Sequence, residues 1–450
     1  MEINNAKKSG PSKITKADIT SNFKLDEQEG PNKGKPLNAS LVNGILRMTY
    51  YESVLQDSIK ANIVYGDVGN AVEGKSAIEG LPIVGTEDFR LEFEDNSENK
   101  IKVDMNVNTV TPIYEDSQKN VVSMELVSEE FLLNEMGDTR LRSRFNGKVS
   151  EHIKQILEKN LKTEKKLHIE DSLNEYNFIG NGRKPYYMMN LLSKQGIPID
   201  YDKRSAGFLF FETSEGFHFK SLEGLFNQKQ KKSYIFNNST DIQGTPVGYD
   251  GKILKYQSNS TLNVQSKMNM GAYKTKIVLF DAYNCKYMTE THSAYDEDSA
   301  IESVGQTLPK FNAKFDSEQF KNEFTRTTLY MVDSGSLPGA KSTEEQIKAN
   351  TADNFKAITT LNQSIRRYNQ LFSGMMEVTI AGDFSLHAGD VIFVDIFSVQ
   401  AEKDDTVNRE SGGLYIIADL CHFVNADGTY TKLNLARDSF GRKGNHTTRV

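Results

Sequence analysis

Apolar and polar residues alternate with a period of two over several short runs near each end of the chain. Four such runs occupy residues 375–435, and a similar series occupies residues 41–130, with glycine, aspartate and asparagine turns between the runs. Successive side chains of a strand point to opposite faces of a sheet, so this period predicts antiparallel strands with one buried face. A curled sheet of such strands can close into a small barrel, which removes exposed edges. The pattern therefore predicts two β units.

The two predicted β units can be aligned with each other. Residues 85–93 align with residues 389–397, and residues 123–127 with residues 432–436, so that alternating positions and a turn glycine coincide. Any two alternating strands can be aligned in this way, so the alignment is compatible with a repeat without establishing one. If the two units are copies of one barrel, they should have the same strand order.

Between the β units, several segments have apolar residues spaced by three or four. Residues 149–161 place their apolar side chains on one face of a helix, and a second helix is predicted to begin at Pro185, where the missing N–H is not needed. Residues 208–219 predict a hairpin of aromatic strands, and residues 343–372 predict a long helix that leads into the second β unit. Residues 227–340 give no clear pattern. The predicted fold class is α+β, mainly β.

The composition is typical of a globular protein with more than one domain. The chain has 450 residues, 37% hydrophobic and 26% charged, which is longer than a single core usually organises. No run of about 18 apolar residues occurs, so we expect no membrane insertion, and no secretory signal pattern is found. Cys285 and Cys421 are far apart in the sequence, with no partner at metal spacing. They are predicted to be buried thiols in a reducing compartment.

The charged residues are unevenly distributed at the amino terminus. The net charge of −7 predicts a surface that does not attract polyanions as a whole. Residues 1–36 instead contain seven lysines and five acidic residues, with few apolar side chains. They are predicted to form a flexible N-terminal arm. The alternative is an arm that becomes ordered on a neighbouring subunit.

Three segments resemble binding motifs only in part. Residues 335–342 read Gly-Ser-Leu-Pro-Gly-Ala-Lys-Ser, but Ala340 and a spacing one residue short distinguish them from a phosphate-binding loop. Residues 296–298 are acidic, and such a run is more typical of a solvated loop than of a cation site. Arg366 and Arg367 are more typical of side chains that solvate a packed helix face than of a polyanion contact.

The histidines do not form a catalytic or metal-binding pattern. His218 and His422 lie in strand-like aromatic runs, where a hydrogen-bonded structural role is the commonest one. We therefore assign no catalytic, cofactor-binding or metal-binding residue, expect no cofactor, and predict that the chain is not an enzyme. The seven histidines are His152, His168, His218, His292, His387, His422 and His446.

Two segments carry a resemblance to a known family. Residues 207–226 contain Gly-Phe-Leu-Phe-Phe-Glu followed by Gly-Phe-His-Phe-Lys-Ser-Leu-Glu-Gly-Leu-Phe. Residues 365–440 contain Arg-Tyr-Asn, Gly-Asp-Phe-Ser-Leu-His-Ala-Gly-Asp-Val-Ile, Ser-Gly-Gly-Leu-Tyr-Ile-Ile and Thr-Lys-Leu-Asn-Leu-Ala-Arg-Asp. Together they resemble the central baseplate hub protein of contractile-tailed phages, the T-even-like myoviruses and especially their relatives that infect cyanobacteria. The motifs are structural and indicate no catalytic residue.

The resemblance implies a homotrimer in which each chain contributes two barrels similar to the tail-tube fold. Six barrels would form a pseudo-sixfold ring under the tail tube, and intervening α/β domains would face a threefold central spike. The implied function is a structural baseplate hub that adapts tube to spike and leaves a channel for DNA as cargo. The implied location is the tail baseplate of the virion, assembled in the cytoplasm of the bacterial host. The implied partners are the trimeric central spike protein, tail tube or tube-initiator proteins, inner baseplate wedge proteins and the tape-measure protein.

The pattern and the resemblance together predict five segments in the chain. They are a flexible N-terminal arm (1–36), a first tube-like β-barrel domain (37–135), middle α+β domains that face the spike (136–345), a helix with a second tube-like β-barrel domain (346–442), and a tail (443–450).

Two other functions are compatible with the sequence. One is a cell-wall hydrolase fused to a tail module, with its site in residues 227–340, which turnover of purified cell wall would reveal. The other is a spike or hub component of a bacterial contractile injection system, which shares the fold and would differ in its genomic neighbours.

In the structural interpretation, turn glycines matter more than polar side chains. Gly389 precedes a predicted strand at a position where a positive φ is expected. We therefore expect Gly389→Val to damage folding or assembly, and His387→Ala to be nearly silent.

Overall fold

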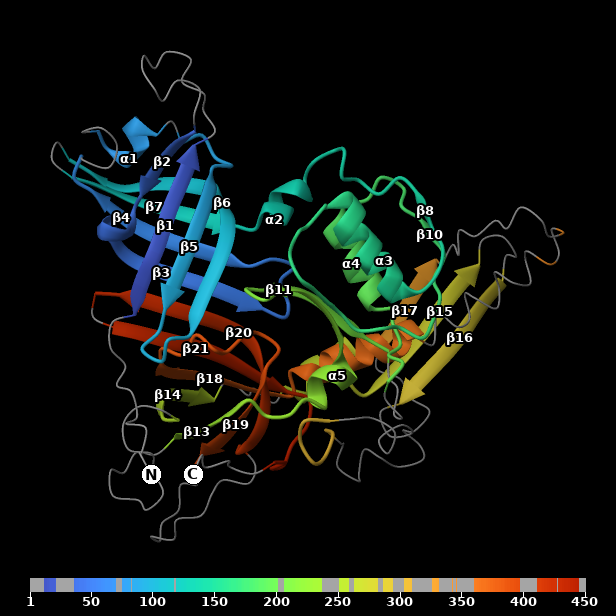
Figure 1. Ribbon diagram of the computed structural model, residues 1–450. Coiled ribbons are helices and arrows are strands. Elements are labelled where there is room, and N and C mark those ends of the chain that lie inside the picture. Colours follow the sequence, from blue (N-terminus) through green and yellow to red (C-terminus); the bar gives the residue numbers. More distant parts are fainter. Residues whose placement is uncertain are drawn as a thin grey trace, which may run out of the picture.

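The computed structural model places two curled β-sheets edge to edge, with helices and three smaller sheets beside them (Figure 1). The two curled sheets form the two predicted β units, and their strands belong to one continuous 13-stranded sheet. The structure describes residues 12–21, 36–69, 75–81, 83–116, 119–200, 206–236, 251–258, 263–281, 286–293, 303–309, 326–331, 342, 345, 360–396, 411–426 and 428–444.

The first β unit buries alternate residues of each strand in a common core. In β5, for example, Phe89, Leu91 and Phe93 are buried while Asp88 and Arg90 are exposed. The strand order is β3-β4-β7-β6-β5-β1, with the short β2 at the outer edge of β1. Its strands are β1 (Lys13–Ser21), β2 (Leu37–Ser40), β3 (Ile45–Ser53), β4 (Lys60–Asp67), β5 (Asp88–Glu94), β6 (Lys100–Glu115) and β7 (Asn120–Val127).

The second β unit follows the same burial rule. In β18, Met376, Val378 and Ile380 turn into the core and the residues between them do not. The strand order is β14-β18-β21-β20-β19-β13, and a bridge between Ile235 and Lys252 brings the two outer strands together. Its strands are β13 (Lys232–Phe236), β14 (Ile253–Ser258), β18 (Gly374–Ala381), β19 (Val391–Ile396), β20 (Gly413–Asn425) and β21 (Gly428–Arg437).

The two β units have the same strand order, as the predicted repeat requires. Strands β1, β3, β4, β5, β6 and β7 correspond, in both chain order and sheet order, to β13, β14, β18, β19, β20 and β21. One pairing differs, because β1 is antiparallel to β5 whereas β13 is parallel to β19. The aligned residues 123–127 and 432–436 are equivalent in the structure, and residues 85–93 and 389–397 are aligned within one position.

Irregularities in the two sheets also fall at equivalent positions. The equivalent strands β3 and β14 each contain a register shift at the same place relative to their partner strands. The equivalent long strands β6 and β20 also share such a shift. A β-bulge is a specific local feature, so matching bulges are stronger support for a repeat than alternation alone. The shifts lie between Ile45 and Arg47 in β3, Ile253 and Lys255 in β14, Val107 and Thr109 in β6, and Ile417 and Asp419 in β20.

The two barrels are joined by antiparallel pairing of β3 with β20. The register runs from Ser53 opposite Asp419 to Arg47 opposite Asn425. Figure 1 shows the strands of the first barrel continuing into those of the second across this pair. The junction therefore consists of backbone hydrogen bonds in a single sheet, which fixes the orientation of one barrel relative to the other.

A middle region packs against the joined barrels. A core of helices and aromatic strands includes Phe208, Phe217 and Phe219, and the predicted hairpin and the helix beginning at Pro185 are confirmed. The predicted helix at residues 149–161 is an α-helix that continues as one π-helical turn. The elements are α2 (Glu129–Leu133), β8 (Arg144–Phe145), α3 (Val149–Gln155), η2 (Ile156–Asn160), β9 (Leu167–Ile169), β10 (Phe178–Ile179), α4 (Pro185–Ser193), β11 (Phe208–Thr213), β12 (Gly216–Ser221) and α5 (Leu222–Phe226).

Between β14 and β18 the chain forms a further small sheet and a helix. The strand order of this sheet is β16-β15-β17, and residues 360–371 form the described part of the predicted long helix. Residues 227–340, which gave no pattern in the sequence, thus contain two strands of the second barrel and a separate three-stranded sheet. The elements are α6 (Val264–Met270), β15 (Lys274–Asp281), β16 (Lys286–Ser293) and β17 (Arg326–Met331), and the first barrel adds η1 (Val42–Gly44) and α1 (Ala77–Gly80).

The structure corrects two of the predicted boundaries. Residues 13–21, predicted to be part of a flexible arm, form β1 and pair with both β2 and β5 of the same chain. The alternation Ala17, Ile19 and Ser21 on the buried side was hidden by the lysines around it. Strands β13 and β14, predicted to belong to the middle domains, pair with β19 and β18 and belong to the second barrel. The other domain boundaries stay predictions.

Among the described residues, no helix combines the length and the apolar character that a membrane span needs. The expected lack of membrane insertion stays a prediction.

Candidate functional site: the joint between the barrels

The segment between β18 and β19 is buried between the two barrels. Phe384 packs in the core of the first barrel, with its ring centroid 4.9 Å from that of Phe93, while Leu386 packs in the core of the second. The Phe384 N–H also donates to the Asp95 carboxylate of the first barrel at 2.8 Å. Two residues apart in the sequence, these side chains contribute to separate cores. The segment that connects β18 to β19 therefore also packs the two barrels against each other, and it is called the joint below.

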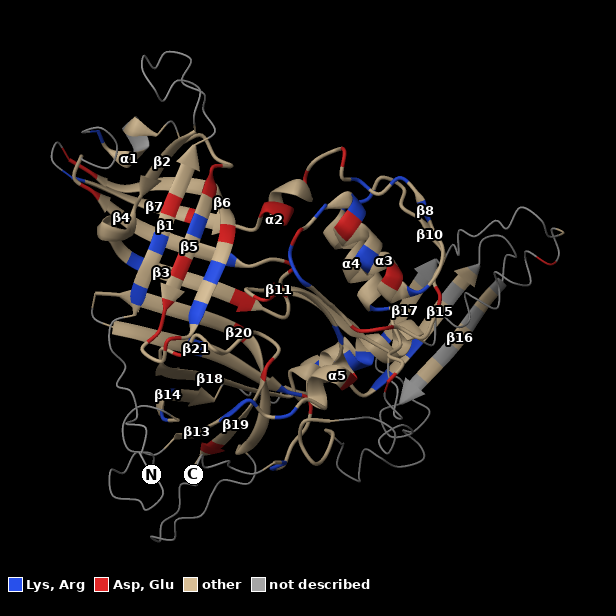
Figure 2. Ribbon diagram, viewed as in Figure 1, with Lys and Arg blue, Asp and Glu red and all other residues tan. Residues whose placement is uncertain are grey.

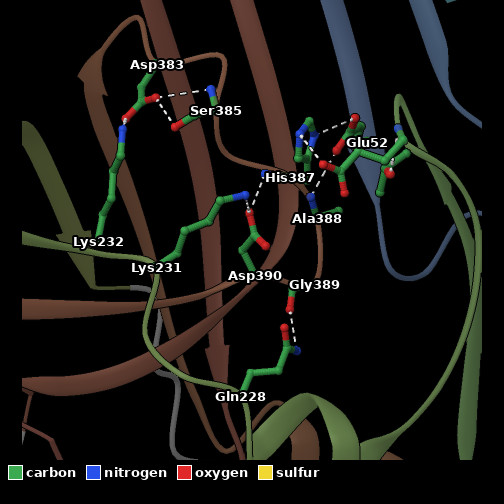
Figure 3. A network of polar contacts seen from close by, with 12 residues as sticks. Glu52, Gln228, Lys231, Lys232, Asp383, Ser385, His387, Ala388, Gly389 and Asp390 are labelled. Atoms are coloured by element: carbon green, nitrogen blue, oxygen red, sulfur yellow. Dashed lines mark hydrogen bonds and ion pairs between the residues drawn. The ribbon is translucent and has the colours of Figure 1, made fainter. Parts of the chain in front are cut away.

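Glu52 is the central acceptor of this joint (Figure 3). It lies on β3 and is buried, and its carboxylate accepts hydrogen bonds from the Ser214 N–H at 2.8 Å and the Ala388 N–H at 3.0 Å. It also accepts from the Tyr50 hydroxyl at 2.9 Å and faces His387 Nδ1 at 3.3 Å. One carboxylate thus binds the first barrel, the β11–β12 turn and the second barrel together.

The charges of Glu52 and His387 support each other. Burial by itself raises the pKa of Glu52, but His387 and the backbone N–H groups of Ser214 and Ala388 outweigh it and lower the pKa to about 2. Burial disfavours protonated His387, yet the Glu52 carboxylate raises its pKa above the ordinary value. His387 is therefore not a free turn residue, and the expectation that His387→Ala would be nearly silent disagrees with its position.

A second buried cluster attaches the middle region to the first barrel. Glu212, on β11, accepts from the Ser128 hydroxyl and from the Ile59 N–H, and it pairs with Lys165 at 2.7 Å. Lys165 also pairs with Glu130 at 2.6 Å. Burial and the nearby Glu130 raise the pKa of Glu212, while Lys165 opposes that shift. A single lysine shared by two carboxylates holds these elements together.

The loop after α5 is bound to the same joint on its other side, as Figure 3 also shows. The Gln228 side-chain amide donates to the Gly389 carbonyl at 3.1 Å, and Lys231 pairs with Asp390 at 2.7 Å. Lys232 pairs with Asp383 at 2.5 Å. Both ends of the 383–390 segment are thereby tied to the strand that enters the second barrel.

Gly389 has the backbone conformation that the sequence predicts. Its φ is +89°, and a Cβ at this position would lie 2.9 Å from Cζ of Phe211. The Gly389 N–H donates to Ile417 and the Ile417 N–H donates to Asp390, which starts β19 against β20. Both the positive φ and the close aromatic ring therefore require glycine.

Arg366 and Arg367 are buried, which contradicts the prediction that they solvate a helix face. Both side chains have at most 1% of their surface exposed. The Arg367 guanidinium lies 3.2 Å from Asp438 and 3.7 Å from Glu223, and it stacks on the ring of Phe226 at 5.1 Å. Arg367 thus connects the 360–371 helix, α5 and the end of β21.

The predicted structural roles of two histidines agree with their contacts. His218 Nε2 lies 2.8 Å from the Thr213 hydroxyl, and burial lowers its pKa to about 3. His422 Nδ1 lies 3.0 Å from the Thr431 hydroxyl, and burial lowers its pKa to about 4. Both rings are therefore neutral at physiological pH.

The other candidates from the sequence are distributed as follows. Cys421 is a free thiol and only half-buried, rather than fully buried, and burial raises its pKa. Residues 296–298, 335–341, Cys285 and His446 lie outside the described residues.

The buried carboxylates Glu52 and Glu212 were missed in the sequence. A signal was present in both cases. Glu52 follows Met48 and Tyr50 on the buried side of β3, and Glu212 ends a run of four apolar residues in β11, a strand that is buried on both faces. A charged residue at an apolar position of a strand indicates a buried partner or a functional role. Their partners come from distant segments, so the sequence could not identify them.

The arrangement positions domains, and its polar groups are directed at protein atoms. Glu52, Glu212 and Arg367 are buried with charged or hydrogen-bonding partners from other segments. Within the part of the chain that the structure describes, no group of three His, Cys, Asp or Glu side chains is placed to hold a metal ion.

Comparison with known proteins agrees with the resemblance found in the sequence. The chain is 23% identical over 299 residues to the "Probable baseplate hub protein gp334" of Vibrio phage KVP40; the match covers 65% of this chain and 66% of that protein, just under two thirds of its length. No protein-family model matches the chain.

Two solved structures share the fold. The prophage MuSo2 43 kDa tail protein from Shewanella oneidensis aligns with a TM-score of 0.50 and 12% identity over 95% of this chain and 100% of its own. The tail protein from Neisseria meningitidis MC58 aligns with a TM-score of 0.52 and 8% identity over 95% and 97%. The chain is thus similar to a probable phage baseplate hub protein, and it shares a mainly β fold with these two tail proteins, as the sequence predicted.

Proposed function

We propose that this chain is the structural baseplate hub of a contractile phage tail, which adapts the sixfold tail tube to the threefold central spike. The observation that carries the proposal is the pair of barrels with one strand order and matching bulges, joined in one sheet. A trimer of such chains presents six similar barrels to a tube and three middle regions to a spike. A chain with a single barrel could not satisfy both symmetries.

The construction of the joint supports this role. A hub that transmits force between tube and spike needs barrels held at a fixed angle. Here that angle is set by the β3–β20 ladder, by the hydrogen bond from the Ala388 N–H to Glu52 and by the hydrogen bond from the Phe384 N–H to Asp95. Each contact uses residues far apart in the sequence, so the barrels cannot turn independently without breaking buried polar bonds.

The expected partners follow from the same proposal. They are two further copies of this chain, a trimeric spike protein, tail tube or tube-initiator proteins and inner wedge proteins, with DNA as cargo in the channel. Figure 2 shows both signs of charge interspersed on β1, β5 and β6, where Lys16 pairs with Glu92 at 3.0 Å and Arg90 with Asp104 at 2.9 Å. This mixed face fits a protein contact better than a polyanion contact.

The test is a deletion of the chain in the phage that encodes it, with the wild-type chain supplied in trans as the control. We expect particles without assembled contractile tails, seen by electron microscopy, and loss of plaque formation that the control restores. Complete, infectious tails in the absence of the chain would contradict a hub. Release of peptidoglycan fragments by the purified chain would contradict the non-enzymatic part of the proposal.

A further inference from the structure

The junction inside the chain uses only one half of a long strand. Along one edge of β20, residues 413–416 pair with β19 and residues 419–425 pair with β3, while on the opposite edge residues 416–425 pair with β21. The second half of β20 is thus the docking edge for the neighbouring barrel.

The equivalent half of β6 has no such neighbour. Residues 100–106 of β6 pair with β5 as the first residues of β20 pair with β19, and residues 106–115 pair with β7 on the other edge. For residues 109–115, the outer edge has no partner strand among the described residues. Apart from the half-buried Val110, the side chains there are exposed, including Ile113 at 58% and Tyr114 at 54%.

Strand β14 is the counterpart of β3 and also has a vacant edge. β3 pairs with β4 on one side and β20 on the other, whereas β14 pairs with β18 alone among the described residues, apart from the single bridge to β13 at one end. Four of its six residues are exposed, and Leu254 exposes 37% of its surface. The chain therefore presents one docking edge and one matching strand, on different barrels.

We propose that β14 of one copy of this chain pairs, antiparallel, with the second half of β6 in the next copy, repeating between chains the β3–β20 junction found within the chain. The inference rests on the proposed hub function for the number of copies, and on the internal repeat for the two edges. Because each edge is on a different barrel, the contact is head-to-tail, and a constant rotation closes it into a ring.

The equivalent positions define the register of the new ladder. Within the chain Tyr50 faces His422 and Arg47 faces Asn425. The equivalents of the first pair are Ser258 and Pro112. Lys255 is the equivalent of Arg47. It lies opposite Glu115 to within one position, and the uncertainty of one position arises from an additional register shift near the end of β6. Opposite charges directly across a ladder are favourable.

Two features suit a contact that forms only on assembly. Pro112 has no N–H, so the ladder between copies has one donor fewer than the ladder within the chain. The apolar side chains of Ile113, Tyr114 and Leu254 add area that the second copy would bury. An exposed strand edge with apolar side chains otherwise favours uncontrolled pairing, so a dedicated partner also protects it.

Charge reversal tests the contact in the full-length chain. Glu115→Lys and Lys255→Glu each place like charges at every junction of the ring, whereas the double variant restores opposite charges. By light scattering, we expect a trimer for the wild type, a dissociation constant raised about tenfold or more for each single variant, and recovery in the double variant. Lys154→Glu, at an exposed position of α3, is the matched control and should leave the mass unchanged.

Disulfide trapping gives a second, independent readout. In a Cys285→Ser and Cys421→Ser background, Ile113→Cys and Gln257→Cys place one thiol on each edge. Oxidation of the double-cysteine variant should yield covalent trimers on denaturing gels. Each single-cysteine variant should yield no covalent species larger than a dimer. Thermal unfolding of each variant shows whether it is folded.

The outcomes separate this inference from the hub function. A trimer that is insensitive to both charge reversals and gives no cross-link contradicts the β6–β14 junction, while the deletion test of the hub stands. A chain that is monomeric at every concentration also contradicts the junction. Restored assembly in the double variant together with cross-linked trimers supports it.

Discussion

The two barrels share a strand order and differ in what is inserted between their strands. In the first barrel, a six-residue turn, residues 54–59, connects β3 to β4. In the second, the equivalent connection from β14 to β18 contains α6, the β16-β15-β17 sheet and the 360–371 helix. The order and the bulges are kept despite this insertion, which shows that the sheet topology does not depend on how the strands are connected.

A second difference lies just after the last strand of each unit, which is β7 in the first barrel and β21 in the second. The ends of β7 and β21 are equivalent, and each leads to a buried charged cluster. After β7, Ser128 bonds Glu212, which Lys165 neutralises from a half-buried position. After β21, Asp438 is neutralised by Arg367, which is fully buried. The two copies are therefore attached to their surroundings by different chemistry at the same place.

The largest effect is expected at the buried arginine. Arg367→Met removes the guanidinium that lies against the buried carboxylates of Asp438 and Glu223, so we expect the free energy of unfolding to fall by about 3–5 kcal/mol. Arg90→Met, at an exposed pair on β5 of the first barrel, should leave the free energy of unfolding nearly unchanged, because solvent screens the pair. Denaturant unfolding measures both, and equal losses would contradict the contrast drawn between the buried and the exposed ion pair.

Equivalent backbone positions should respond with opposite signs to substitution. Gly389 has φ +89°, and its counterpart Thr86 has φ +74°. Gly389→Val combines a strained φ with a clash against Phe211 and should cost about 2–4 kcal/mol. Thr86→Gly relieves the strain of a β-branched residue and should stabilise by up to about 1 kcal/mol. A loss of stability in Thr86→Gly would show that the two turns are not equivalent.

The sequence predicted the repeated elements well and the joints poorly. Alternation in residues such as Phe89 and Leu91 reports burial locally, so strands could be found and even aligned between the copies. Residues 13–21 were missed because lysines surround their buried face. Glu52, Glu212 and Arg367 acquire their roles from partners hundreds of residues away or from other elements, and no local pattern contains that information.

Two titrating groups at the joint, His387 and Glu52, should make the free energy of unfolding depend on pH. The raised pKa of His387 means that its contribution is complete below the unfolded value of about 6.5 and is lost as pH rises through the folded value. The contribution of Glu52, with a pKa of about 2, is complete above the unfolded value of about 4.3 and is lost as pH falls through 2.

His387→Gln tests this assignment directly. Its loss relative to wild type should be about 1–2 kcal/mol near pH 5.5 and smaller above the raised pKa of His387. Unfolding curves at several pH values measure the difference. A loss independent of pH would mean that the ring acts by packing alone.

The smallest effect on stability is expected where a residue of one barrel is replaced by the residue type at the equivalent position of the other barrel. Cys421, half-buried on β20, is equivalent to Thr111 on β6. Cys421→Thr places a strand-favouring residue of similar size in the same ladder and should change stability by less than about 1 kcal/mol. A larger loss in thermal unfolding would show that the environments of the two strands have diverged.

The central claim is that the two barrels are alternate members of one ring. Electron cryomicroscopy of the purified assembly, reconstructed without imposed symmetry, tests it most directly. The account predicts six barrels around a bore, with each barrel related to the next by a rotation near 60°, both within a chain and between chains. Barrels related by an unrelated angle within the chain, or an assembly without six similar lobes, would contradict it.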